Sequence, residues 1–210
     1  MRTYKAFIFL LAVLAAHTCN AQTDVAASVL GAFNTSAKGY GTTQVNSNAA
    51  GGLLEFRHII QPALGFEVAY SYTRSNQADD SILSLAPQVC QSPCLPAPPN
   101  SPIPVSANAH EFTADWIPSA TKGAFRPFAV FGGGVLIDAP SGGQSNTTTA
   151  TKPVFVFGLG ADWAHWKRWG LRFQYRGNLY SAPLLTTQYT STGSLMLTNE
   201  PMVGLYFRLP

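Results

Sequence analysis

Residues 64–73 have the sequence LGFEVAYSYT, in which two kinds of side chain alternate strictly. One set is apolar or aromatic, and it comprises Leu64, Phe66, Val68, Tyr70 and Tyr72. The other set is small or polar, and it comprises Gly65, Glu67, Ala69, Ser71 and Thr73. A period of two residues places successive side chains on opposite faces of a β-strand. The stretch is therefore predicted to be a strand with one apolar face and one polar face.

The same alternation recurs along the chain. It is clear in residues 110–116, 171–176 and 203–209, where aromatic or aliphatic side chains alternate with charged, polar or small ones. Weaker segments of the same kind are residues 25–33, 52–60, 126–137 and 154–163. Together these segments predict eight strands, each about as long as the roughly ten residues with which a tilted strand crosses a bilayer. The facing of residues 126–137 is left unassigned.

The connections between these eight strands alternate between long and short. The long ones are residues 34–48, 75–106, 138–152 and 180–193, and the short ones are 61–63, 118–125 and 164–169. Outer-membrane barrels have an even number of strands, short periplasmic turns and longer outer loops. The predicted fold is therefore all-β, a single closed antiparallel transmembrane β-barrel of about eight strands in meander order, over residues 22–210.

The composition agrees with a membrane barrel. Charged residues make up 11% of the chain, against about 25% in a typical soluble domain. No later segment offers the run of about 18 apolar residues that a membrane-spanning helix needs. Without Arg2 and Lys5, 11 of the 13 basic residues remain against 10 acidic ones. This near-neutral balance argues against nucleic acid as a partner.

Residues 1–21 have the features of a secretory signal peptide. Arg2 and Lys5 precede a short apolar run, FIFLLAVLAA at residues 7–16, and small Ala21 follows. This order predicts export and cleavage after Ala21. Cys19 would leave with the signal, so that Cys90 and Cys94 remain. In an oxidising envelope these two are expected to form a local disulfide at the tip of loop 75–106.

The predicted inward faces carry nine charged residues of both signs. These are Glu55, Arg57, Glu67, Glu111, Asp115, Asp162, Arg172, Arg176 and Arg208. An eight-stranded barrel is just wide enough for its side chains to fill it, and buried charges must pair or pay for desolvation. We expect a closed, salt-bridged plug, with an ion or proton path as the alternative.

All four tryptophans lie at or beside the predicted short turns. They are Trp116, Trp163, Trp166 and Trp169. Tryptophan favours the membrane interface, because its ring is apolar and its N–H can bind water or a headgroup. These residues are expected to form a girdle at the inner interface.

The chain resembles the small OmpA-like outer-membrane barrel proteins. The residues that carry the likeness are Arg126-Pro127-Phe128 leading to Gly132-Gly133-Gly134, residues 158–163 (GLGADW), 171–176 (LRFQYR) and 203–208 (VGLYFR). The resemblance implies insertion into outer-membrane lipid by the barrel-assembly machinery, and we expect a monomer in the bacterial outer membrane. Members of that family commonly end on an aromatic residue, whereas this chain ends Phe207-Arg208-Leu209-Pro210.

No motif in the sequence indicates an enzyme, a cofactor or a metal site. The best candidate for a nucleophilic site is Ser106 with His110 and Glu111, but Glu111 would point away from His110 in a regular strand. His58 and His165 have no metal-ligand spacing, and no G-x-S-x-G or dinucleotide motif is present. The first expectation is a non-enzymatic barrel with a structural or surface-interaction role through its outer loops. The alternatives are a narrow channel for small solutes and, third, a lipid-modifying barrel enzyme.

Overall fold

The structure is a computed structural model that describes residues 21–61, 63–81, 103–120, 124–141, 146–164, 166–186 and 191–210. Within these ranges the regular secondary structure consists of β-strands. No helix long and apolar enough to cross a membrane occurs among the described residues. The predicted signal peptide, Cys90, Cys94 and His165 lie outside them.

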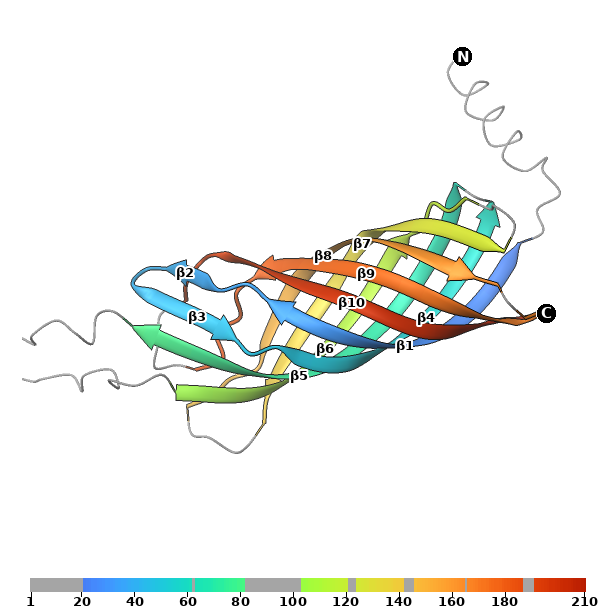
Figure 1. The fold of residues 1–210 in the computed structure, drawn as a ribbon. Coiled ribbons are helices and arrows are strands. Elements are labelled where there is room, and N and C mark those ends of the chain that lie inside the picture. The colour runs from blue at the N-terminus through green and yellow to red at the C-terminus, as the bar shows by residue number, and fades with distance from the viewer. Residues whose placement is uncertain are drawn as a thin grey trace, which may run out of the picture.

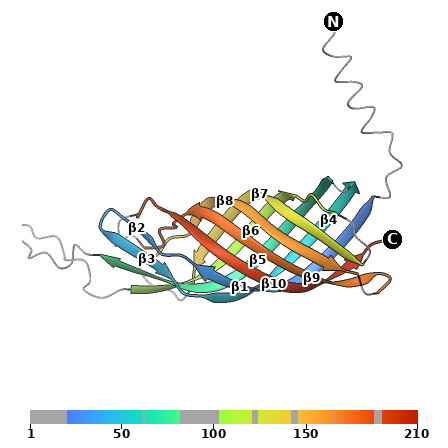
Figure 2. The same cartoon turned by 45° about the horizontal axis from the view of Figure 1, so that its top comes forward.

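Eight long strands form one closed barrel, which confirms the predicted fold class. They are β1 (Gln22–Asn34), β4 (Ala49–Gln61), β5 (Leu64–Ser81), β6 (Ile103–Trp116), β7 (Phe125–Pro140), β8 (Ala150–Trp163), β9 (Trp169–Ser181) and β10 (Leu195–Arg208). Each of these strands pairs antiparallel with the next one along the chain, and β1 pairs with β10. The last pairing closes the meander into a barrel, as Figures 1 and 2 show.

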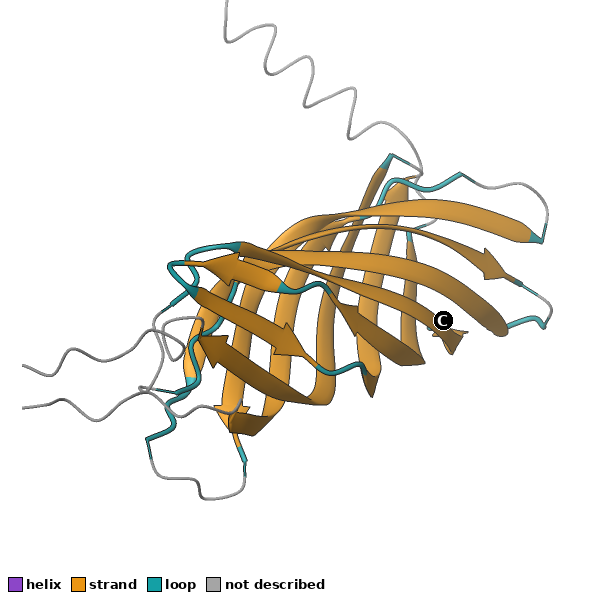
Figure 3. Cartoon of the chain, turned by 60° about the vertical axis from the view of Figure 1, so that its left-hand side comes forward, coloured by secondary structure: helices purple, strands orange, loops and turns teal. Residues whose placement is uncertain are grey.

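The two ends of the barrel differ. The end at which β1 begins and β10 finishes carries the three short turns, and we call it the inner end (Figure 1). The opposite, outer end carries a small hairpin of β2 (Ala37–Gly39) and β3 (Thr42–Asn46), seen in Figure 3. Strand β3 pairs with β5, so the hairpin extends the barrel wall. The prediction that residues 34–48 form a loop was therefore wrong for most of that segment.

The other outer loops are also shorter than predicted, because the strands run further at the outer end. Strand β5 continues through Ser81 and β6 begins at Ile103, within predicted loop 75–106. Strands β7 and β8 take the two ends of 138–152, and β9 takes Tyr180 and Ser181 from 180–193. The 18 residues of β5 clearly exceed the roughly ten residues with which a tilted strand crosses a bilayer. The outer part of the barrel therefore projects beyond the membrane.

A belt of large apolar side chains surrounds the barrel. Every one of the eight strands contributes exposed residues to it, including Val29, Leu54, Val68, Phe112, Phe131, Leu159, Phe173 and Val203. On β5 the outward positions change from Phe66, Val68 and Tyr72 to Arg74 and Asn76. Exposed apolar surface on this scale is the lipid-facing band of a transmembrane barrel, and on β5 it ends near Tyr72.

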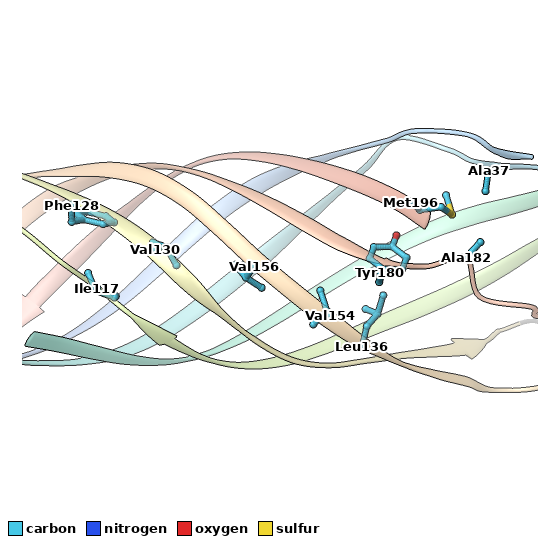
Figure 4. Close-up of a cluster of buried hydrophobic side chains, with 10 residues drawn as sticks. All are labelled: Ala37, Ile117, Phe128, Val130, Leu136, Val154, Val156, Tyr180, Ala182 and Met196. Atoms are coloured by element: carbon cyan, nitrogen blue, oxygen red, sulfur yellow. The ribbon is translucent and has the colours of Figure 1, made fainter. Parts of the chain in front are cut away.

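The inside of the barrel has one apolar side. A stripe of buried side chains runs along it from Ile117 at the inner end, through Phe128, Val130 and Val156, to Met196 at the outer end (Figure 4). These residues come mainly from β7, β8, β9 and β10. The charged side chains of the interior pack beside this stripe, where water has little room to screen them.

Candidate functional site

The centre of the charged interior is Arg172 on β9, which is fully buried. Its Nε donates to Asp162 Oδ1 at 2.8 Å, its Nη1 to Glu55 Oε2 at 3.0 Å and its Nη2 to Asp24 Oδ1 at 2.9 Å. These carboxylates come from three other strands, β8, β4 and β1. A single guanidinium therefore ties together opposite parts of the barrel wall.

Arg57 on β4 forms the second part of the same cluster. Its Nε donates to Glu67 Oε2 at 2.9 Å, and its Nη1 lies 3.5 Å from Asp162 Oδ2. Its guanidinium carbon lies 4.1 Å from the centre of the Phe128 ring, a distance at which a cation and an aromatic face attract each other. Asp162 thus joins Arg57 to Arg172 in one network.

Arg176 on β9 carries the network toward the outer end. Its Nη2 lies 3.3 Å from Asp115 Oδ2 and 3.7 Å from Glu111 Oε1, and its Nη1 lies 3.5 Å from Glu67 Oε1. The same Nη2 donates to Thr113 Oγ1 at 3.0 Å. Three strands, β5, β6 and β9, therefore meet at this one guanidinium.

Eight of the nine charges expected inside are buried and ion-paired, but Arg208 is not among them. It is half buried at the inner end, where its Nη2 lies 3.4 Å from the hydroxyl of Tyr206. The sequence reasoning also missed buried charges, namely Asp24, Asp79, Arg126, Asp138 and Glu200. Arg126 bridges Asp24, at 3.0 Å, and Asp162. Asp24, which lies directly opposite Arg57, continues the period-two pattern of β1 one position before the predicted start.

The outer half of the interior contains a small cavity of about 30 Å³. Glu111, Asp138, Asn178, Tyr180 and Glu200 are among the residues that line it. The Nδ2 of Asn178 donates to Glu111 Oε2 at 2.9 Å. A cavity of this volume has room for about two water molecules, so it is a chamber and not a pore.

The outer mouth of the barrel is capped by the chain that follows β9. The amide of Ala182 donates to Ser194 O at 3.0 Å, and Gln77 Nε2 donates to Pro183 O at 3.2 Å. Leu185 is buried in an apolar cluster with Val105, Ala107 and Ala150. Residues 182–186, called the cap below, therefore pack inside the projecting part of the barrel wall.

Asp79 is buried beside the cap, beyond the lipid-facing band. Gln77 Nε2 donates to its carboxylate at 3.0 Å, and no ion pair with it is found among the described side chains. Burial raises the pKa of the Asp79 carboxyl, and the hydrogen bond from Gln77 offsets that rise only in part.

The four tryptophans lie at the inner end. Trp116 ends β6, Trp163 ends β8, Trp166 lies in the following turn and Trp169 begins β9. Trp116, Trp166 and Trp169 are about half exposed, and Trp116 Nε1 donates to Ala63 O at 2.9 Å. This placement suits the predicted interface girdle, because ring surface is available to lipid while the N–H has a polar partner.

The weak enzyme candidate does not assemble. Glu111 is buried inside the barrel, whereas His110 lies on the outer face with its Nδ1 2.9 Å from the hydroxyl of Tyr70. Ser106 donates instead to Asn76 Oδ1 at 2.7 Å. Where the chain is described, no group of three or more histidine, cysteine or acidic residues is arranged to hold a metal directly.

The fold is similar to those of solved outer-membrane barrels. No family model and no curated protein matches the chain. Among solved structures, it is similar to the Neisserial surface protein A, NspA, with a TM-score of 0.61 and 13% identity over 90% of this chain and 99% of NspA. It is also similar to Ail, the attachment invasion locus protein of Yersinia pestis, solved with the heparin analogue sucrose octasulfate (TM-score 0.54, 14% identity, 90% and 99% covered).

A third similar structure is the outer membrane protein OprG from Pseudomonas aeruginosa, with a TM-score of 0.52 and 10% identity over 91% of this chain and 97% of OprG. Identities this low establish the fold alone. Together with the lipid-facing band, the closed meander and the short inner turns, they identify the chain as a barrel with the fold of the small OmpA-like proteins of the bacterial outer membrane.

Proposed function

We propose that this protein is a non-enzymatic outer-membrane barrel that contacts external surfaces through its outer end. The observation that carries the proposal is the way the interior is filled. Buried ion pairs around Arg57, Arg172 and Arg176 occupy the middle of the barrel, and the cap closes the outer mouth. A barrel closed at two levels offers its outer surface, and not a passage, to other molecules.

The outer end provides a rigid surface for such contacts. Strands β5 and β6 and the β2–β3 hairpin project beyond the lipid-facing band as one paired sheet. Tyr40 at the hairpin tip is 78% exposed and has a φ of 47°, a conformation that costs a residue with a side chain about 1–2 kcal/mol. Exposed tyrosine and loops on a rigid scaffold are common features of binding surfaces.

The similarity to Ail suggests a first ligand to test, because that protein was solved with a heparin analogue. Exposed cations at the described outer end include Lys38 and Arg74. We propose sulfated polysaccharide as the first probe class for this surface. Immobilised heparin, together with an array of neutral glycans, would show whether charge or the aromatic tip dominates recognition.

The test uses cells that carry the barrel in their outer membrane, and it measures their retention on heparin and on the glycan array. In one variant a short Gly-Ser linker replaces residues 83–101, which leaves β5 and β6 intact. A second variant is Tyr40→Asn, which suits the positive φ and removes the ring. We expect retention of wild-type cells and loss in at least one variant, with unchanged heat-modifiable migration. Equal retention of wild-type, variant and barrel-free cells would contradict the proposal.

A further inference from the structure

The buried charges of the barrel do not balance. Among the described residues, the buried carboxylates inside the membrane part are Asp24, Glu55, Glu67, Glu111, Asp115, Asp138, Asp162 and Glu200, against Arg57, Arg126, Arg172 and Arg176. All four arginines are committed to carboxylates in the inner and middle part of the interior. Buried charges are normally paired, bound to a metal ion or neutralised, so the remaining acids need either protons or a further positive charge.

The unmatched acids gather in the outer half. Asp138 and Glu200 form no ion pair with any described side chain, and Glu111 has only the shared Arg176, at 3.7 Å. The half-buried Lys152 forms no ion pair with any of the three. These three residues, from β7, β10 and β6, line the same cavity of about 30 Å³.

Unpartnered oxygens around this cavity give an independent indication. Asn178 is 1% exposed, and its Oδ1 has no hydrogen-bond partner. The same is true of Glu200 Oε2 and Asp138 Oδ2. The Nδ2 of Asn178 is already used by Glu111. Every one of these unsatisfied atoms is an acceptor oxygen, so the cavity calls for a donor or a cation and not for an anion.

We propose that the cavity binds a hard divalent cation of the Ca²⁺ type, held by the carboxylates of Glu200 and Glu111 and the amide oxygen of Asn178. Ca²⁺ takes carboxylate, amide and water oxygens in irregular geometry, which matches this mixed set. No three acidic side chains here are arranged to hold a metal directly. The ion therefore keeps part of its water shell, for which a cavity of this size has room. It supplies the charge that lets β6 and β10 bring Glu111 and Glu200 together beside Asn178 of β9.

The direct test measures Ca²⁺ binding to the full barrel, refolded in detergent with Ca²⁺ and then dialysed. We expect one ion for each wild-type barrel. Glu200→Gln should weaken binding by at least about tenfold, because loss of even a supporting group costs a metal site 10- to 100-fold. The matched control is Asp80→Asn, which removes an exposed acid of β5 outside the cavity and should leave binding unchanged. Retention of no ion by the wild type, or equal retention by Glu200→Gln, would overturn the proposal.

A second measurement distinguishes a bound cation from bound protons. The midpoint of urea unfolding should rise with Ca²⁺ and fall with a chelator in the wild type and in Asp80→Asn, but not in Glu200→Gln. The contrary result is that Ca²⁺ does not change the unfolding midpoint of the wild type, while Glu200→Gln is more stable than the wild type to the same extent with and without Ca²⁺. In that case protonated carboxyls balance the charge and there is no cation site.

Discussion

Arg57 and Glu67 lie directly opposite each other on β4 and β5, and both Nε and Nη2 of the arginine donate to Oε2 of the glutamate. Neither side chain is exposed. A cross-strand pair with two charge-assisted hydrogen bonds fixes the relative register of these strands. The pair also places the Arg57 guanidinium over the Phe128 ring, so that one contact links the charged and apolar sides of the interior.

Removal of one partner of this pair should destabilise the barrel strongly. Arg57→Met leaves Glu67 buried, with only Arg176 at 3.5 Å, and should cost about 3–5 kcal/mol. The double variant Arg57→Met/Glu67→Met should recover much of this loss, because it removes both buried charges. Urea unfolding of all variants in lipid vesicles gives the coupling energy. A double variant as unstable as the single one would show that the pair does not act as a unit.

The lipid-facing band makes a prediction that depends on depth. Val68 is 60% exposed on β5 and lies within the apolar band. Val68→Arg should therefore cost about 2–4 kcal/mol in a bilayer. Asp80→Arg, on the same strand and the same face but beyond the band, should change stability by less than about 1 kcal/mol. Equal costs at both positions, measured by unfolding from vesicles, would place the membrane boundary elsewhere.

The strand count, the meander and the facing of six strands follow from the alternation in the sequence. The alternation correctly places Glu111 and Arg172 inside the barrel, and their neighbours His110 and Phe173 outside it. It does so because a lipid-facing side chain must be apolar, whereas its neighbour inside is free to be charged. That rule applies only where lipid is present. It therefore predicts the membrane part well.

The strand ends were underestimated for the same physical reason. Beyond the bilayer both faces of a strand meet water or polar groups, so Ser75, Asn76 and Gln77 of β5 show no apolar period. Glu200 was missed because Pro201 follows it and the clear alternation begins only at Val203. The pairing of Thr43 with Asp80 depends on tertiary contacts between distant segments, which a local pattern does not contain.

The glycine run of β7 makes a steric prediction. A Cβ on Gly134 would lie 1.8 Å from the backbone oxygen of Phe112 on β6, so that the two strands would have to move apart. Gly134→Ala should therefore destabilise the barrel by about 1–3 kcal/mol. Gly52→Ala is the matched control, because its nearest atom would be Ser28 O at 3.7 Å, an ordinary contact. Equal stability of the two variants in urea unfolding would contradict this account.

The buried Asp79 predicts a pH dependence of the projecting part. Its pKa is raised in the folded barrel, so the folded state binds this proton more tightly than the unfolded chain does. The stabilisation that this proton provides is fully present below the ordinary carboxyl pKa. It is lost as the pH rises through the pKa that Asp79 has in the folded barrel. Asp79→Asn should therefore be more stable than the wild type at neutral pH, with the difference shrinking or reversing in acid. A difference independent of pH would show that Asp79 does not titrate in this way.

The filled interior predicts that the purified barrel does not conduct. In a planar bilayer, ions would have to pass Arg172 and its three carboxylates and then the cap, and breaking those buried pairs is costly. Gln77→Leu removes the hydrogen bond to Pro183 O and should loosen the cap. We nevertheless expect no conductance from this variant, because Arg172 and its three carboxylates below the cap are unchanged.

Insertion of each protein is checked by fluorescence of a labelled barrel in the same bilayer, so that silence cannot result from missing protein. Discrete conductance steps in the wild type would contradict the closed interior and favour the channel hypothesis. Steps that appear only in Gln77→Leu would show that the cap is the barrier. In that case the arginine network allows ions to pass, and the surface-contact proposal loses its main support.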